Sequence, residues 1–150
     1  MSDCLIRRMT RDDLPRLLEI ERESFPVPWT RGMFLDQLSQ GAFSINVVCV
    51  SGGLVTGYAA AWAICDEIHL LSIAVDPRNR RAGAGTALLE AVIEEGRPAG
   101  GRIVMLEVRR GNDPARRFYE KHGFRTVGER PGYYRETGED AVLMERILDD

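Results

Sequence analysis

Arginine and glycine residues gather in one segment of this chain in a pattern suited to binding an anion. The run Arg78-Asn79-Arg80-Arg81-Ala82-Gly83-Ala84-Gly85 follows an apolar segment that ends at Val75, and it leads into a segment with helical spacing. A helix N-terminus presents unpaired N–H groups and a positive dipole end, and glycines let a bulky diphosphate approach the backbone. The run is neither a Walker loop nor a dinucleotide fingerprint, because no Gly-Lys-Ser/Thr follows and Leu88 replaces the third glycine. It predicts an anion cradle, with a solvated surface turn as the alternative.

A carboxylate inside an apolar segment is the second candidate for chemistry. Glu107 interrupts the segment from Ile103 to Val108, which is otherwise apolar. A carboxylate in such a place must be solvated, be paired with a cation, or lie in a cleft where its protonation state matters. Two interpretations stay open: a general base, and a charge at the end of a strand that pairs with a neighbour such as Arg109.

A tyrosine on the following segment is the third candidate. Asn112, Ala115 and Tyr119 have helical spacing around the segment 114–122. A tyrosine keeps its proton at neutral pH, so it can act as a general acid. From spacing alone, packing beside Phe118 is the favoured interpretation, because buried tyrosines usually find only a hydrogen-bond partner.

The periodicity around these residues predicts the elements that must position them. Apolar and β-branched segments predict strands over 5–9, 45–50, 54–63, 68–75, 103–108, 125–129 and 141–147. Helical spacing and capping residues predict helices after Thr10, after Thr30, over 86–95 and over 114–122. Because a meander comes first and alternation follows, we expect an α/β (α+β) sandwich: a mixed, mostly antiparallel sheet of about seven strands with helices on both faces.

Composition is that of one ordinary globular domain over residues 1–150. Of the 150 residues, 44% are hydrophobic and 29% charged, which is enough to bury a core. The formal net charge of −3 argues against a nucleic-acid partner, because phosphate binding draws on an excess of Lys and Arg. No segment approaches the length of a membrane span and no signal-peptide pattern is visible, so we expect a cytoplasmic protein that does not bind membranes.

The cysteines and histidines suggest neither a disulfide framework nor a metal site. Cys4, Cys49 and Cys65 are widely spaced and odd in number, and no CxxC pair occurs. His69 and His122 are the two histidines, so we expect no metal site. His122 falls at a predicted helix end, where it interacts favourably with the dipole, and we interpret it as structural.

Together these residues resemble the core of the GNAT superfamily of N-acetyltransferases. Arg80, Gly83 and Gly85 match that family's Gln/Arg-x-x-Gly-x-Gly/Ala motif. The resemblance implies the GNAT acyl-CoA N-acyltransferase fold and acetyl-CoA as the co-substrate, with its pyrophosphate held by the loop amides and its pantetheine arm by the preceding strand. The implied cofactor-binding residues are Ile73, Ala74, Val75, Arg80, Arg81, Ala82, Gly83, Ala84, Gly85, Thr86 and Asn112.

A narrower resemblance suggests roles for the two candidate catalytic residues. Leu106-Glu107-Val108-Arg109, Tyr119 and Gly123-Phe124 are similar to the signature of the RimI-like family, which acetylates the N-terminal alanine of a small-subunit ribosomal protein. The resemblance implies Glu107 as the general base for the amine and Tyr119 as the general acid for the CoA thiolate. An N-terminal amine has a pKa of about 7.7–8.0, so a carboxylate that accepts its proton, directly or through water, would assist attack on the thioester.

Two aromatic segments resemble the peptide-binding regions of the same family. Phe25 and Trp29 lie between the first two helices, and Tyr133 and Tyr134 lie in the loop expected to join the last two strands. The family often has a proline after the tyrosine pair, where this chain has Arg135. Exposed aromatic residues also mark protein interfaces, so a partner-binding patch is a compatible alternative.

The resemblance predicts an acetyl-CoA-dependent Nα-acetyltransferase that acts on a protein N-terminus, with a tRNA-modification subunit as a further docking partner. The alternatives are an acetyltransferase of lysine side chains or small-molecule amines, and a catalytically silent acyl-CoA-binding regulator. A lysine amine, with a pKa of about 10.4, is harder to deprotonate, so the pH dependence on α- and ε-amines discriminates between acceptors. The presence of both Glu107 and Tyr119 argues against the silent regulator.

Overall fold

A seven-stranded sheet forms the centre of the computed structural model, which describes residues 4–80 and 83–148. The strands are β1 (Leu5–Arg8), β2 (Ser44–Ser51), β3 (Leu54–Ile64), β4 (Glu67–Val75), β5 (Ile103–Arg109), β6 (Arg125–Tyr134) and β7 (Glu139–Ile147). Their order in the sheet is β1-β2-β3-β4-β5-β7-β6. The β4–β5 pair is parallel, and each other neighbouring pair is antiparallel. The expected mixed, mostly antiparallel sheet is confirmed.

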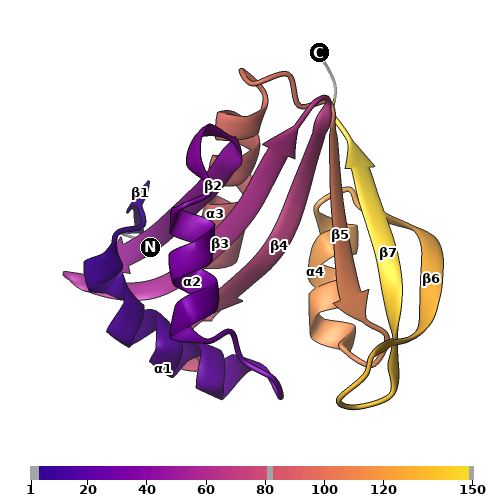
Figure 1. Cartoon of the computed structure of the whole chain (residues 1–150), viewed down its shortest axis with the longest axis horizontal. Coiled ribbons are helices and arrows are strands. Elements are labelled where there is room, and N and C mark those ends of the chain that lie inside the picture. Colours follow the sequence, from indigo (N-terminus) through magenta and orange to yellow (C-terminus); the bar gives the residue numbers. More distant parts are fainter. Residues whose placement is uncertain (1–3, 81–82, 149–150) are drawn as a thin grey trace.

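Helices cover both faces of this sheet (Figure 1). One face carries α1 (Leu14–Ser24) and α2 (Arg31–Leu38), and the other carries α3 (Ala84–Gly96) and α4 (Asp113–Lys121). Short 3₁₀ turns, η1 (Arg11–Asp13), η2 (Gly41–Phe43) and η3 (Pro77–Asn79), precede α1, β2 and the segment before α3. The predicted cap of α2 is confirmed, since the Thr30 side chain accepts the Met33 N–H at 3.2 Å. No helix in the described part of the chain is long and apolar enough to cross a membrane.

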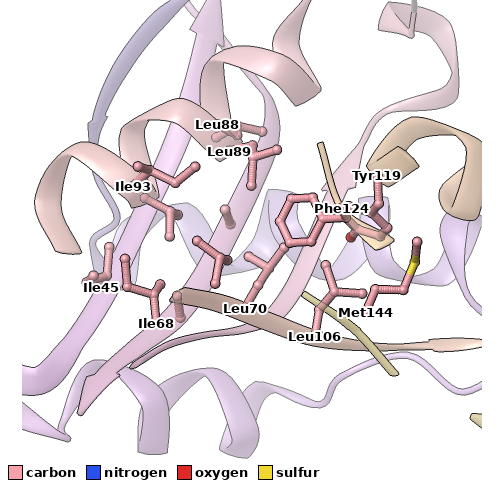
Figure 2. Packing of buried hydrophobic residues seen from close by; sticks show 14 of the residues in the cluster. Ile45, Ile68, Leu70, Leu88, Leu89, Ile93, Leu106, Tyr119, Phe124 and Met144 are labelled. Carbon is pink, nitrogen blue, oxygen red and sulfur yellow. The ribbon is translucent and has the colours of Figure 1, made fainter. Parts of the chain in front are cut away.

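Two hydrophobic cores lie on the two faces of the sheet. The core under α3 and α4 is built from apolar residues of both helices and of the central strands (Figure 2), including Leu70, Leu88, Leu106, Tyr119 and Met144. The core under α1 and α2 contains Leu14, Leu17, Ile20, Phe34 and Tyr58. Burying a Leu or Ile side chain contributes about 1.5–3 kcal/mol, so each helix is fixed mainly by its apolar face.

The parallel pairing of β4 and β5 ends abruptly, and this positions the candidate site. It runs from Glu67 opposite Ile103 to Leu70 opposite Leu106 and stops there. At the same point Leu71 is an extra residue in β4, because Ala60 pairs with Ser72 and Ala61 with Leu70. A bulge bends its strand, and Figure 1 shows β4 and β5 together at one end and apart at the other. The sheet is therefore split between the far halves of β4 and β5.

The closing strands are longer than the sequence predicts. β6 continues to Tyr134 and β7 begins at Glu139, so the expectation that Tyr133 and Tyr134 lie in a loop was wrong. Pro131 and Gly132 look like strand breakers, but the structure accommodates them in an irregularity of the β6–β7 pairing between Arg130 and Tyr134. Both tyrosines are thus held on a strand.

The expectation that the cysteines form no disulfide was also wrong. Cys4 and Cys49 are bonded, with their Cα atoms 5.8 Å apart, although 45 residues separate them in the chain. Cys4 precedes β1, and Ile6 of β1 pairs with Cys49 of β2, so strand pairing brings the two sulfur atoms together. Sequence spacing carries no signal of this contact. Cys65 is free and exposed.

Candidate functional site

A cavity of about 400 Å³ opens where β4 and β5 part. Its walls come from the segment before α2, from α2 itself, and from β3, β4, β5 and β6. It is lined by Trp29, Met33, Asp36, Gln37, Gln40, Trp62, Leu70, Leu71, Glu107, Tyr133 and Tyr134. The cavity therefore brings together four residues that the sequence predicts for the site: Trp29, Glu107, Tyr133 and Tyr134.

Glu107 projects from β5 at the rim of this cavity. Its side chain is 31% exposed, and its Oε2 lies 3.4 Å from Nε of Arg130. The Tyr133 hydroxyl donates to Oε1 at 3.4 Å. The pairing with Arg109 that the sequence leaves open does not occur, because Arg109 contacts Glu139 at 3.4 Å instead. A solvated carboxylate with two long contacts is free to accept a proton from a bound amine.

Tyr119 lies in the core and does not line the cavity. It is 7% exposed, and its ring packs on Phe118 and Phe124 with centroids 5.3 and 5.5 Å away. Burial raises the pKa of the Tyr119 phenol well above its ordinary value, and Tyr134 adds to the shift. Core packing and proton donation are therefore compatible, because a buried phenol with a raised pKa keeps its proton at neutral pH.

The two tyrosines of β6 are also held in the neutral form. Burial raises the pKa of Tyr134 to about 12, against the opposing effect of Arg109, whose guanidinium lies 4.0 Å from the ring centroid. The charge of Glu107 raises the pKa of Tyr133. The part of the wall that β6 contributes is thus made of neutral phenols, with the Glu107 carboxylate beside Tyr133.

The predicted anion cradle has the expected backbone geometry. Gly83 caps α3 in the left-handed region at φ 84°, which a non-glycine residue adopts at a cost. A Cβ on Gly85 would lie 3.2 Å from Cε1 of Phe118, so a side chain there would crowd α4. Ala84 is buried in the core, and the first N–H groups of α3 have no partner within the helix. Arg81 and Ala82, predicted to bind the cofactor, lie outside the described residues.

The side chains of Arg78 and Arg80 anchor the cradle. The Arg80 guanidinium donates to the Val75 carbonyl at 3.2 Å and to Ser24 Oγ at 3.4 Å, which ties the end of β4 to α1. Arg78 bonds Asp76 through its side chain and its backbone N–H. These bonds and, to a smaller extent, the contact with Arg16 hold the pKa of the Asp76 carboxyl below its usual range.

Thr86 connects the two helices beside the cradle. His122 Nδ1 lies 2.7 Å from the Phe118 carbonyl and donates to it, so in the neutral imidazole Nε2 accepts from the Thr86 hydroxyl at 2.9 Å. The start of α3 and the end of α4 are therefore joined by side chains. This agrees with the structural interpretation of His122.

The residues predicted to hold the pantetheine arm flank the split in the sheet. Ile73, Ala74 and Val75 follow the bulge, where β4 has no β5 partner. An unpaired strand edge offers main-chain hydrogen bonds to an extended ligand. Asn112 caps α4, since its Oδ1 accepts the Ala115 N–H at 3.3 Å. The side-chain oxygen is therefore used in capping the helix.

Much of the cavity wall had not been predicted from the sequence, and one residue predicted for the site, Phe25, lies outside the wall. Phe25 packs against the core under α1 and α2 and does not line the cavity. Met33, Asp36, Gln37 and Gln40 line it instead, and their helical spacing was a signal for a shared face. Gln37 also fixes Trp62, because its Oε1 accepts the indole N–H at 2.8 Å. Nothing in the sequence indicated that Leu71 would line the cavity.

Comparison with known proteins agrees with this arrangement. Residues 14–124 match the family model described as the acetyltransferase (GNAT) family. A [ribosomal protein bS18]-alanine N-acetyltransferase of Escherichia coli strain K12 is 36% identical over 141 residues, covering 93% of this chain and 94% of that protein.

Two solved structures extend the comparison to the fold. The crystal structure of the ribosomal-protein-S18-alanine N-acetyltransferase from Escherichia coli is 33% identical, with a TM-score of 0.87 over 98% of this chain and 95% of that one. The structure of Ard1 from Thermoplasma volcanium is 32% identical, with a TM-score of 0.89 over 98% of this chain and 99% of that one.

Proposed function

The chain belongs to the acetyltransferase (GNAT) family and is an acetyl-CoA-dependent N-acetyltransferase, and we propose that its acceptor is the N-terminal α-amine of a protein. The names of its relatives favour the N-terminal alanine of a small-subunit ribosomal protein as that acceptor. The observation that carries the proposal is the cavity that Glu107 lines together with Trp29, Tyr133 and Tyr134. Its volume of about 400 Å³ lies in the range of ligand pockets.

Acetyl-CoA and the acceptor would reach the split in the sheet from opposite faces. The start of α3 lies on the face with α4 and would hold the pyrophosphate through its N–H groups. The free edge of 73–75 would hold the pantetheine arm. The acceptor cavity is walled by Trp29 and α2 on the other face. The two substrates would therefore meet where β4 and β5 part.

The bulge supplies a backbone donor at this meeting point. Leu71 is the extra residue in β4 and lines the cavity. An extra residue in a bulge is left without its ladder partner, so its N–H is available to the carbonyl oxygen of the thioester. Donors that point at a developing oxyanion stabilise the transition state of acyl transfer.

The proposed reaction needs one base and one acid. Glu107 accepts a proton from the α-ammonium, directly or through water, once the amine displaces the contacts of Arg130 and Tyr133, each 3.4 Å long. The amine nitrogen then bonds to the acetyl carbon, the bond from that carbon to sulfur breaks, and the nitrogen loses its second proton to solvent, to which Glu107 also returns the proton that it accepted. Tyr119 gives its proton to the departing thiolate and regains one from solvent. No covalent enzyme intermediate is required, so no cysteine takes part.

Mass spectrometry on a peptide panel tests the proposal. Short peptides with varied first residues and one internal lysine are incubated with acetyl-CoA and the purified protein. We expect acetylation of the α-amine, strongest for peptides that start with Ala or Ser. Acetylation of lysine alone would show that the protein is an acetyltransferase of lysine side chains and would refute the proposed acceptor. Acetyl-CoA binding without product on any peptide or on the intact ribosomal protein would favour the silent regulator.

Two further expectations rest on the same proposal. A ribosomal-protein acceptor supports the cytoplasm as the compartment. Docking of a tRNA-modification subunit stays a prediction from the sequence resemblance, because no feature of the described residues and no name among the relatives supports it.

A further inference from the structure

Glu21 is a buried carboxylate that the proposed reaction does not use. It lies on α1 and is 0% exposed. Its Oε1 accepts the backbone N–H of Trp29 at 2.9 Å. Its Oε2 makes no hydrogen bond within the described part of the chain. Burial raises the pKa of Glu21, while the Trp29 N–H and the Tyr58 hydroxyl oppose the shift. The carboxylate therefore contacts Trp29, which belongs to the cavity wall, and lies near Tyr58 of the core behind it.

The loop that Glu21 contacts has few polar anchors of its own. Residues 25–30 include Pro26 and Pro28, which have no N–H to donate. Trp29 follows the second proline and lines the cavity, with its ring centroid 5.1 Å from that of Phe34. The hydrogen bond to Glu21 thus fixes the backbone of the residue that forms this wall.

A second set of contacts connects Glu21 with the bulge in β4. Tyr58 lies between Trp29 and Ser72: its ring centroid is 6.5 Å from that of Trp29, and its hydroxyl is 2.7 Å from Ser72 Oγ. Burial and then the Glu21 charge raise the pKa of Tyr58 well above its ordinary value. Ser72 directly follows Leu71, the bulged residue at the cavity. Glu21 and Tyr58 therefore connect the part of the cavity wall formed by Trp29 with the part formed by the bulged residue Leu71.

Stability alone does not account for a charge at this position. A buried carboxylate with an unmatched oxygen costs free energy that a neutral glutamine would largely avoid. Residues that reduce stability in this way are often retained for function. The contacts of Glu21 identify that function with the wall of the acceptor cavity.

We propose that Glu21 is a positioning residue for the acceptor: it fixes Trp29 and, through Tyr58 and Ser72, the bulged segment of β4, so that the amine and the thioester meet in one geometry. The inference rests on the proposed use of the cavity by a peptide. It assigns to α1 a part in acceptor binding, although α1 contributes no residue to the lining of the cavity.

The test compares Glu21→Leu and Glu21→Gln with the control Asp13→Asn. Asp13 is a second buried carboxylate near α1, but it bonds Arg7 and the Thr10 N–H and does not line the cavity. For each variant we would measure kcat and KM for an Ala-starting peptide, the Kd of acetyl-CoA, the thermal midpoint, and the exchange rate of the Trp29 amide by NMR without substrate.

We expect Glu21→Leu to raise the peptide KM about tenfold, the effect of losing one hydrogen bond to a charged group, with acetyl-CoA affinity unchanged and faster Trp29 exchange. Glu21→Gln should show a smaller rise in KM at an equal or higher thermal midpoint, because its amide oxygen can still accept the Trp29 N–H. Asp13→Asn should lose stability and keep the peptide KM.

An unchanged peptide KM in Glu21→Leu would overturn the inference, as would an equal loss of acetyl-CoA affinity or a raised KM in Asp13→Asn. If Glu21→Leu does not fold, Tyr58→Phe decides, because it keeps the ring and removes the hydroxyl that reaches Ser72 Oγ: a peptide KM equal to that of the wild type refutes the positioning role. Failure of the proposed function is a different result, in which the wild-type protein acetylates no α-amine. The Trp29 exchange rates then still report whether Glu21 fixes the loop.

Discussion

Replacing Tyr119 with phenylalanine removes one oxygen atom and leaves the packing around it intact. The ring lies 5.3 Å from Phe118 and 5.5 Å from Phe124 between centroids, and the phenylalanine ring keeps both contacts. Acetyl-CoA should bind with unchanged affinity, because the proposed cradle is formed by the backbone at the start of α3. A change in turnover would therefore report the hydroxyl itself.

Tyr119→Phe should lower kcat strongly and reduce the free energy of unfolding only slightly. A positioned general acid typically contributes about 10²–10⁴-fold, so kcat for Tyr119→Phe should fall within that range. Loss of one hydroxyl interaction costs about 0.5–1.5 kcal/mol, and for a chain of this length 1 kcal/mol lowers the thermal midpoint by about 2–4 °C. The protein should stay folded at the assay temperature.

Steady-state acetylation of an Ala-starting peptide would measure the effect, with calorimetry for acetyl-CoA binding. Tyr134→Phe is the matched control, because Tyr134 is a tyrosine of the cavity wall whose pKa is likewise raised by burial, to about 12. Burial keeps Tyr119 protonated far above neutral pH, so wild-type activity should show no decline from its ionisation between about pH 7 and 9. Unchanged turnover in Tyr119→Phe, or an equal or larger loss in Tyr134→Phe, would remove Tyr119 from the role of acid.

Three further changes test the base, the cradle and the fold. Glu107→Gln should slow turnover most at low pH, where the amine is mostly protonated; a small loss that is uniform across the pH profile would indicate packing instead. Gly83→Val should abolish acetyl-CoA binding in a calorimetric titration, because a β-branched residue is strained at φ 84°; retained affinity would refute the cradle. Asp76→Asn should lower the thermal midpoint at pH 7, because the hydrogen bonds of Arg78 lower the pKa of Asp76 in the folded state. That contribution is present above the ordinary Asp pKa of about 3.9 and is lost as the pH falls through the folded value. The wild-type and Asp76→Asn midpoints should therefore converge in strong acid, and a constant difference would contradict the assignment.

Local patterns in the sequence predicted nearly every helix and strand, because apolar spacing reports which face is buried. The cap of α2 at Thr30 and the glycine start of α3 were confirmed in the same way. Long-range pairings were not accessible: Cys4 bonds Cys49 through the β1–β2 register. Single-residue irregularities were also hidden, since nothing in an apolar strand identifies Leu71 as a bulge.

The candidate site shows the same division between local and long-range information. Glu107 stood out as a carboxylate in an apolar strand, and in the structure its partly exposed side chain lines the cavity. Pairing with Arg109, one of the alternatives that the sequence left open, does not occur, because Arg109 contacts Glu139. The actual neighbour of Glu107 is Arg130, which the irregular β6 positions there. Trp29 and Tyr133 were predicted from the family resemblance alone, and their convergence depends on the tertiary fold.

The bulge at Leu71 explains why the chemistry falls at this point of the sheet. Before the bulge, Ile68 and Leu70 pack in the core under α3 and α4, whereas after it Ala74 packs in the core under α1 and α2. The parallel ladder ends at Leu106, one residue before Glu107, so β4 does not pair with β5 at the position of the carboxylate. Where the ladder ends, the bulge lies beside an unpaired edge of β4, which we propose holds acetyl-CoA, and beside an exposed carboxylate on β5, while the N–H of Leu71 is the proposed donor to the thioester oxygen. The same irregularity can therefore position the donor, the oxyanion and the base.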